Sequence, residues 1–322
     1  MNKKVAVIGT GYWGKNLVRN FKEIGVLGAV CDTDQEQLAK IKEKHEVPEI
    51  FSDYKELLLK KNIDAVILAT PAATHYELAK AAIESGKDVF VEKPVALRFE
   101  EAQDLAQCLN KHQKILMVDH LLLYHPAVNK LKEIIDQGKL GKLQYIYSNR
   151  LNIGKLRTEE NILWSFAPHD ISVILYLLEK TPTQVRAFGE AYLQDHIYDT
   201  TLTDLTFSDR LKAHIFVSWL HPFKEQKLVV IGSAGMAVFN DVEPEEKLTF
   251  YPHKVEWIKQ IPVAAKASKE VIPLEAKEPL REACLHFLDC IETRTPPKTN
   301  IQEATHVLEV LQKAQMELEG KT

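Results

Sequence analysis

Short apolar runs alternate with amphipathic stretches over the first third of the chain. The runs have the length of single strands and lie at residues 4–9, 27–31, 64–69, 88–91 and 115–118. Continuous apolar runs of this length are typical of strands that are buried on both faces of a parallel sheet. Helical periodicity follows Gly14 and recurs at residues 53–60, 74–85 and 99–111. The alternation predicts a doubly wound parallel sheet.

Three local signals set limits to these helices. Asp53-x-x-Glu56 and Thr74-x-x-Glu77 fit capping boxes, and Gly86 fits a helix stop.

The pattern changes after residue 120. A helix over residues 127–137 is followed by strand-like segments with few helices between them, at residues 143–148, 184–193, 202–220, 227–232, 236–240 and 247–251. Successive strands of this kind predict a largely antiparallel sheet in an α+β domain. We expect a helix containing His169 and Asp170 to pack beside it, and two further helices near residues 281–293 and 302–319. A broad sheet with one face free of helices is often an oligomer interface, so we expect a homodimer or homotetramer.

Composition limits the possible functions. A chain of 322 residues is long enough for two domains with separate cores. The formal charge of −4 gives no electrostatic reason to expect nucleic acid or an acidic membrane surface as a partner. No apolar run has membrane-helix length, the N-terminus does not resemble a signal peptide, and the four cysteines form no CxxC pair. We therefore expect a cytoplasmic protein.

A glycine-rich turn joins the first apolar run to the first helix. Gly9, Gly11 and Gly14 form a G-x-G-x-x-G pattern, and Asp32 follows Gly14 by 18 residues, close to the usual spacing of about 20. In such turns the pyrophosphate of a dinucleotide approaches the helix N-terminus, and the acid binds the adenosine ribose hydroxyls. An ordinary turn between a strand and a helix is the alternative. The pattern favours an NAD-binding Rossmann domain (residues 1–120) and a substrate-binding and oligomerisation domain (residues 121–322), an α/β fold overall.

Two polar segments follow strand ends in the first domain. Thr70-Pro71 and Glu92-Lys93-Pro94 should face the cofactor, because ligands of such sheets bind beyond the C-terminal strand ends. Lys93 would then reach the nicotinamide end of the site. Pro94 favours an extended backbone at Lys93 and permits a cis peptide bond. The alternative is that the strand simply reaches solvent at this lysine.

The segments GTGYWG, ATPAATH and VEKP, together with the antiparallel second domain, resemble the Gfo/Idh/MocA family of sugar and inositol oxidoreductases. The resemblance covers essentially the whole chain and implies NAD(P) in the first domain and a sugar or cyclitol between the domains. It implies that Lys93 touches both substrate and nicotinamide. The implied cofactor-binding residues are Gly9, Gly11, Tyr12, Trp13, Gly14, Asp32, Thr33, Thr70, Pro71, His75, Glu92 and Lys93.

The same resemblance points to His169 as the second catalytic residue. The family pattern Asp-x-x-x-His aligns with SFAPHDISVILYLL and places His169 on the histidine and Ser165 on the aspartate. Imidazole suits a general base near neutral pH. Ser165 departs from the pattern, and it carries no negative charge. Asp170 does not replace it, since neighbouring helix residues point in different directions. The alternative is a histidine at a helix start, after Pro168, with no ligand.

The segment between Asn149 and Asp170 resembles a subgroup that oxidises UDP-N-acetylglucosamine at C3. It carries Arg150, Lys155 and Arg157, and guanidinium groups suit bidentate binding of phosphate. A solvated surface loop is the alternative. The subgroup's product is aminated by a PLP-dependent aminotransferase, giving diamino sugars for lipid A and other surface glycans. The implied substrate-binding residues are Lys93, Tyr124, His125, Arg150, Arg157, Trp164 and His169.

Three other functions compete with this one. Metal-assisted oxidation is disfavoured because HEXXH and CxxC patterns are absent, so no metal site is predicted. A different sugar or inositol dehydrogenase, or a sugar-nucleotide 3-ketoreductase, is the enzymatic alternative; the basic segment argues against free polyols, and Asp32 argues against an NADPH-driven reductase. A non-catalytic dinucleotide-binding regulator is the other, and the presence of both Lys93 and His169 argues against it.

For Tyr124 and His125, a hinge or packing role is the alternative.

Overall fold

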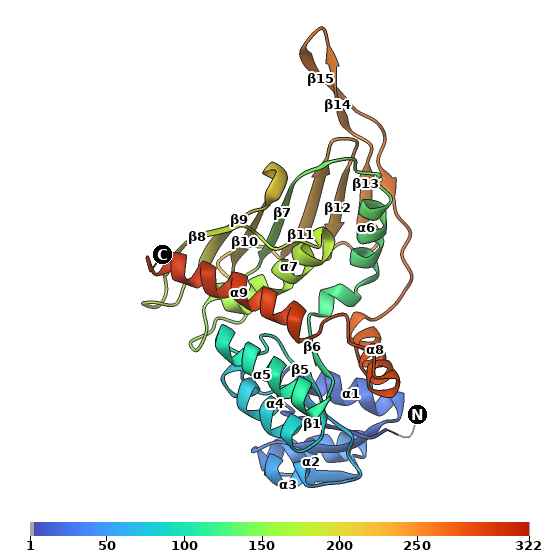
Figure 1. Cartoon of the computed structure of the whole chain (residues 1–322), viewed down its shortest axis with the longest axis vertical. Helices are drawn as coiled ribbons and strands as arrows, with labels where there is room; N and C mark the ends of the chain where they lie inside the picture. Colours follow the sequence, from blue (N-terminus) through green and yellow to red (C-terminus); the bar gives the residue numbers. More distant parts are fainter. Residues whose placement is uncertain (1–2, 322) are drawn as a thin grey trace. The chain divides into compact units, whose positions relative to one another are not determined.

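The computed structural model describes residues 3–321 and divides into two compact units (Figure 1). Unit 1 comprises the described residues up to Leu121 together with Glu278–Leu308, and unit 2 comprises Leu122–Lys277 together with the described residues from Glu309 onward. The predicted boundary at residue 120 lies beside the first of these breaks. The C-terminal segment Glu278–Leu308, which the sequence pattern assigned to the second domain, belongs to unit 1.

The described part of unit 1 is built on a six-stranded parallel sheet. Its strand order is β3-β2-β1-β4-β5-β6, the doubly wound order in which β2 and β3 are added on one side of β1 and β4, β5 and β6 on the other. The predicted parallel sheet is therefore confirmed. The strands are β1 (Val5–Ile8), β2 (Leu27–Cys31), β3 (Glu49–Phe51), β4 (Ala65–Leu68), β5 (Asp88–Val91) and β6 (Leu116–Val118).

Helices cover this sheet, and most begin or end within two residues of the predicted positions. They are α1 (Gly14–Ile24), α2 (Gln35–His45), α3 (Tyr54–Leu58), α4 (His75–Glu84), α5 (Phe99–His112), α8 (Pro279–Thr293) and the first part of α9 (Ile301–Leu318). Sequence reasoning did not predict α2 or the short strand β3.

The predicted helix limits are only partly confirmed. Gly86 has φ +80°, as expected of a residue that stops a helix, and the Asp53 side chain accepts from the N–H of Lys55 at the start of α3. The predicted cap at Thr74 is wrong. Its hydroxyl donates to the Pro71 carbonyl oxygen at 2.8 Å, and this bond turns it away from the first N–H groups of α4.

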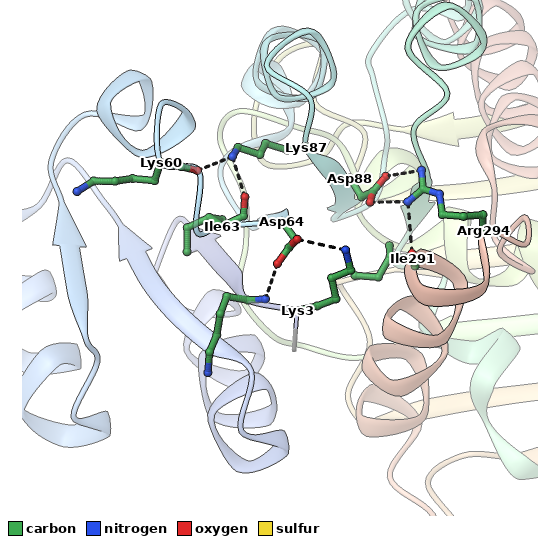
Figure 2. A network of polar contacts seen from close by, with 9 residues as sticks. Lys3, Lys60, Ile63, Asp64, Lys87, Asp88, Ile291 and Arg294 are labelled. Carbon is green, nitrogen blue, oxygen red and sulfur yellow. Dashed lines mark hydrogen bonds and ion pairs between the residues drawn. The ribbon is translucent and has the colours of Figure 1, made fainter. Parts of the chain in front are cut away.

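A polar network lies at the amino ends of the parallel strands (Figure 2). The Lys87 ammonium donates to the carbonyl oxygens of Lys60 and Ile63 at 2.5 and 2.7 Å. The Asp64 carboxylate accepts from the N–H of Lys4 at 2.8 Å. These bonds join the segments that enter β1, β4 and β5. Structural hydrogen bonds thus occupy the amino edge of the sheet and leave the carboxyl edge to other chemistry.

Asp88, the first residue of β5, explains how the C-terminal segment belongs to unit 1. The Arg294 guanidinium, just beyond α8, donates to both oxygens of the buried Asp88 carboxylate at 2.7 and 3.1 Å (Figure 2). Asp88 also accepts from the N–H of Ile115 at 2.8 Å. At the other end of α8, the Glu278 carboxylate accepts from Arg19 on α1 at 2.5 Å. Charged pairs far apart in sequence therefore hold both ends of α8.

Unit 2 is built on an eight-stranded sheet formed by residues 143–271. The order is β16-β13-β12-β11-β7-β10-β9-β8; β7 and β10 are parallel, and the other neighbours are antiparallel, which confirms the largely antiparallel prediction. The strands are β7 (Leu143–Leu151), β8 (Gln184–Glu190), β9 (Thr200–Thr206), β10 (Lys212–Ser218), β11 (Glu225–Gly232), β12 (Met236–Asn240), β13 (Leu248–Tyr251) and β16 (Glu270–Val271). A separate hairpin, β14 (Lys254–Ile258) with β15 (Ile261–Ala265), extends away from this sheet (Figure 1).

Helices lie on one face of the sheet in unit 2. They are α6 (Pro126–Asp136), α7 (Ile162–Leu178) and the described end of α9, and α7 packs on β7, β9 and β10. Along β7, Ile146, Ser148 and Arg150 are buried, whereas Tyr145 on the opposite face is exposed. This alternation decides which side chains of β7 meet α7.

Two further findings concern the chain as a whole. Each of the four cysteines is a free, buried thiol, as expected of small apolar side chains. Within residues 3–321, every helix is too short or too polar to cross a bilayer.

Candidate active site

The glycine turn after β1 is shaped by close approaches at two of its three glycines. Gly9 has φ +90°, and a Cβ built on it would lie 2.6 Å from the carbonyl oxygen of Ala69. A Cβ on Gly14 would lie 2.0 Å from the carbonyl oxygen of Gly9. Around Gly11, by contrast, no described atom lies within 4 Å of such a Cβ. The outer glycines are therefore required by packing, and the middle one borders open space that a ligand can enter.

The start of α1 can bind an anion. Its N-cap residue, Trp13, provides no side-chain cap in the described structure, and the first turn carries no acidic residue. The N–H groups of Lys15 and Asn16 donate to the carbonyl oxygens of Gly11 and Trp13 at 3.3 and 2.8 Å, and the helix dipole favours negative charge at this end of α1. Tyr12 beside it is 82% exposed.

Asp32 stands at the carboxyl end of β2 and is held by the same turn. One oxygen of its carboxylate accepts from the N–H and the hydroxyl of Thr10 at 2.7 and 2.9 Å, and the other accepts from the N–H of Asp34 at 3.0 Å. Two carboxylate oxygens offer about four lone-pair sites, so capacity remains for a ribose hydroxyl. Thr33 next to it is exposed. The open space at Gly11, the uncapped helix start and this fixed acid all fit NAD.

The turns after β4 and β5 are linked by His75, which is 1% exposed. Its Nδ1 lies 2.7 Å from the carbonyl oxygen of Pro94, and its Nε2 lies 2.8 Å from that of Thr70. The imidazole thus ties the segment Thr70-Pro71 to the segment that contains Lys93. Both ring nitrogens therefore face backbone carbonyls inside the unit, and the cofactor contact of His75 stays a prediction.

Lys93 follows the carboxyl end of β5, half-buried, and its peptide bond to Pro94 is cis, as the sequence permitted. Glu92 lies beside Asp119, since Val91 of β5 pairs with Val118 of β6 in the parallel register. Burial and, next, the negative charge of Asp119 raise the pKa of Glu92 well above its ordinary value. Sequence reasoning missed Asp119. This residue follows the apolar run at residues 115–118 in the same way that Glu92 follows the run at residues 88–91.

In unit 2, His169 lies in the middle of α7. The helix begins at Ile162 with Asn161 as its N-cap, so the histidine is seven residues into the helix and Pro168 is an interior proline. The alternative of a histidine at a helix start is therefore wrong. His169 is half-buried and Ser165, one turn earlier, is buried.

Arg150 is not part of a loop. It is on β7, buried, and its guanidinium donates to both oxygens of the Asp170 carboxylate at 2.7 and 3.2 Å. Ser148 donates to the same carboxylate at 2.6 Å. These bonds replace the predicted phosphate contact of Arg150, because the β7 alternation turns this side chain toward α7. They also show that Asp170 is engaged with the sheet.

The irregular segment between β7 and α7 keeps the other two basic residues. Lys155 is exposed, and Arg157 forms ion pairs with Glu159 at 3.8 Å and Glu160 at 3.6 Å. Acidic neighbours therefore offset part of the positive charge that the sequence suggested.

Packing contacts occupy the remaining predicted substrate residues. Tyr124 is buried, and His125 is the N-cap of α6, where its Nδ1 accepts from the N–H of Ala127 at 3.0 Å. Burial lowers the pKa of His125, which favours the neutral ring that this cap requires. The Trp164 indole donates to the side chain of Gln315 at 3.0 Å. A structural role, the alternative for Tyr124 and His125, accounts for these contacts.

Acidic, histidine and cysteine side chains do not gather into a metal site: among residues 3–321 no group of three or more is placed to hold an ion.

Comparison with known proteins places both units. Residues 3–120 match an oxidoreductase family with an NAD-binding Rossmann fold, and residues 128–238 match the Gfo/Idh/MocA C-terminal domain. The UDP-N-acetylglucosamine 3-dehydrogenase of Acidithiobacillus ferrooxidans is 29% identical over 196 residues, 61% of this chain and 60% of that protein. The NAD(+)-dependent scyllo-inositol 2-dehydrogenase of Bacillus subtilis is 27% identical over 323 residues, 95% and 91% of the two chains.

Solved structures agree on the fold. The structure of UDP-N-acetylglucosamine 3-dehydrogenase from A. ferrooxidans superposes with a TM-score of 0.88 at 23% identity, covering 100% of this chain and 99% of that one. Unit 1 is an NAD-binding domain, and the chain belongs to the Gfo/Idh/MocA family of oxidoreductases.

Proposed function

We propose that the protein oxidises the C3 hydroxyl of UDP-N-acetylglucosamine to the ketone, with NAD⁺ as the hydride acceptor. The observation that carries an oxidation is Lys93 at the carboxyl end of β5, on the same sheet edge as the glycine turn and Asp32. The sugar nucleotide rests on the resemblance of residues 149–170 and on the relative from A. ferrooxidans that bears this activity in its name.

The proposed reaction divides between two side chains. Bound NAD⁺ would supply the acceptor for the hydride of C3. The Lys93 ammonium donates to the C3 oxygen and stabilises the negative charge that develops there, while His169 takes the hydroxyl proton. The C–H electron pair leaves as hydride and the O–H electron pair forms the new carbon–oxygen bond. Ser165 supplies no carboxylate in this scheme, so the imidazole acts without the aspartate that the family pattern provides.

Recognition of the diphosphate is assigned to Arg157, because Arg150 is committed to Asp170. The two arginines make a matched pair for a test. Replacing Arg157 with Ala should raise KM for the UDP-sugar far more than KM for NAD⁺. Arg150→Ala should instead lower the stability of the protein, since it leaves the buried Asp170 carboxylate without its cation. Equal effects of Arg157→Ala on both KM values would contradict the assignment.

The test of the function is direct. The protein is incubated with NAD⁺ and a panel of UDP-sugars and free polyols, and NADH absorbance is recorded. UDP-N-acetylglucosamine should give the highest kcat/KM, and the ketone should accumulate poorly unless a glutamate-dependent, PLP-containing aminotransferase removes it. Activity on inositol or glucose that exceeds activity on every UDP-sugar would overturn the proposal.

Oxidation of a free cyclitol or sugar is the second candidate. The ion pairs of Arg157 with Glu159 and Glu160 favour it, because they reduce the positive charge available for a diphosphate. The relative from B. subtilis acts on scyllo-inositol according to its name. The same substrate panel decides between the two.

A further inference from the structure

We propose that Glu92 and Asp119 share a single proton and that this acid pair, with its one remaining negative charge, positions the Lys93 ammonium. The shared proton is a property of unit 1 alone. The positioning of Lys93 rests on the proposed function, in which that lysine meets the substrate oxygen.

The register of the parallel sheet brings the two acids together. Val91 pairs with Val118, the N–H of Asp119 donates to the carbonyl oxygen of Val91 at 2.8 Å, and Glu92 and Asp119 are the next residues along their strands. Both side chains therefore leave the same edge of neighbouring strands. Asp119 is 2% exposed, and two ionised carboxylates at such a place would repel each other strongly.

Oxygen atoms without donors point to the proton. Among residues 3–321, Glu92 Oε1 and Asp119 Oδ1 are buried and find no hydrogen-bond partner. Ionised carboxylates only accept hydrogen bonds, whereas a protonated carboxyl group donates one. A proton on either acid therefore turns this arrangement of acceptors into a donor and an acceptor. The Trp13 indole favours the charged form of both acids, yet its Nε1 is also buried without a well-formed bond.

The groups that face the pair decide which charge remains. The hydrogen bond between the two acids raises the pKa of Glu92 and lowers that of Asp119, and His120 also favours the ionised form of Asp119, whereas Lys93 favours the ionised form of both. The His120 imidazole lies 2.6 Å from Glu303 of α9. Burial and, next, the negative charge of Asp119 raise the pKa of the Cys284 thiol of α8. Burial raises the pKa of both acids, well above the ordinary value for Glu92. Glu92 is accordingly the protonated member and Asp119 the charged one.

The sign of the pH dependence follows from this direction. A group whose pKa is raised by folding contributes stability below its unfolded pKa and loses it as pH rises through the folded pKa. The folded protein should therefore lose stability as pH rises from the ordinary pKa of a glutamate toward the raised pKa of the pair. Glu92→Gln keeps a donor for Asp119 and cannot dissociate, so that loss should be absent in this variant.

The first experiment measures the free energy of unfolding by urea against pH, on the full chain without added NAD⁺. The stability of the wild type should fall toward alkaline pH relative to Glu92→Gln, whereas Glu84→Gln, at an exposed position of α4, should run parallel to the wild type. Parallel curves for the wild type and Glu92→Gln would sink the proposal. Should Glu92→Gln not fold, the infrared band of a protonated carboxyl group in the wild type decides. It should persist at neutral pH and vanish at alkaline pH, and its absence at neutral pH would also refute the shared proton.

The second experiment uses turnover. In the wild type, kcat should decline toward alkaline pH as the shared proton leaves, and Glu92→Gln should lack that decline when scaled to its own neutral value. The double variant Glu92→Gln, Asp119→Asn removes the negative charge and should lose about ten- to a hundredfold in kcat beyond either single variant, as expected for one charged hydrogen bond. An alkaline decline of the same shape in Glu92→Gln would contradict the positioning role. Absence of turnover on every substrate would refute the proposed function instead, and the unfolding curves would still test the shared proton.

Discussion

Asp32 carries the choice between NAD and NADP. Thr10 and Asp34 hold its carboxylate in place, so a 2′-phosphate would approach a fixed negative charge. Like charges about 4 Å apart repel by roughly 4 kcal/mol at an effective dielectric near 20, and solvent reduces this. We expect NAD to bind at least about tenfold more tightly than NADP, with the gap narrowed by Asp32→Ala and unaffected by Glu36→Gln on the exposed side of α2. Equal dissociation constants for the two cofactors in a fluorescence titration would refute the assignment.

Lys93 and His169 should each be required for turnover. Positioned acid–base groups contribute about 10²–10⁴-fold and a lost electrostatic donor costs about 10²–10³-fold. Lys93→Ala and His169→Ala should therefore each lower kcat by at least about a hundredfold, while NAD⁺ binding survives. Because both are proposed to act on one oxygen, the double variant should fall well short of the product of the single losses. If His169→Ala kept a near-normal kcat at all pH values, the proton acceptor would be Lys93 or His125 instead.

The sequence was sufficient to identify residues that belong to local motifs. It was not sufficient where the role of a residue depends on the direction of its side chain. The glycine turn and Asp32 lie where their spacing placed them, because a strand, a tight turn and a helix are local structures. Arg150 has the chemistry of a phosphate ligand, but the pleat of β7 turns it toward Asp170. That direction depends on which face of the sheet α7 covers, which no local pattern states.

At the scale of elements, Arg294 should hold α8 to the sheet of unit 1. Arg294→Ala removes both donors to the buried Asp88 carboxylate, which keeps only the N–H of Ile115 among its described partners. Because Arg294 is partly exposed, we expect a loss of about 1–3 kcal/mol in the free energy of unfolding, measured by urea denaturation. Arg281→Ala on α8, which breaks an exposed ion pair with Glu23 of α1, should cost less than about 1 kcal/mol. A larger loss for Arg281→Ala would contradict this ranking.

The helices and strands themselves could be read from periodicity, since burial on one or both faces leaves a repeat in the sequence. The assignment of α8 to unit 1 could not be predicted in this way. Its place in unit 1 depends on pairs such as Asp88 with Arg294, which are 206 residues apart in the chain. Because residues 278–308 follow the second domain along the chain, the sequence pattern assigned them to that domain. In the structure, Glu278–Leu308 belongs to unit 1.

At the scale of the whole molecule, we propose that the open face of the eight-stranded sheet joins copies of this chain. Phe188, Leu202 and Phe216 stand side by side across β8, β9 and β10, and Phe188 is 63% exposed. A row of apolar side chains on a helix-free face is typical of an interface. The protein should sediment as a homodimer or homotetramer, and Phe188→Asp should shift it toward smaller species. Leu59→Asp, at an exposed site of unit 1, should not change the sedimentation.

The return of the chain to unit 1 has a consequence for biosynthesis. During translation, Asp88 and Phe90 emerge from the ribosome long before their partners Arg294 and Phe287. The ring centroids of Phe90 and Phe287 lie 5.6 Å apart in the folded unit. Until Glu278–Leu308 has been made, the nascent sheet lacks one of its helices and exposes apolar core side chains. Unit 1 should thus complete its fold only near the end of translation. A chain stopped at residue 121 should be digested rapidly by protease, and a peptide spanning residues 278–308, added in trans, should protect it.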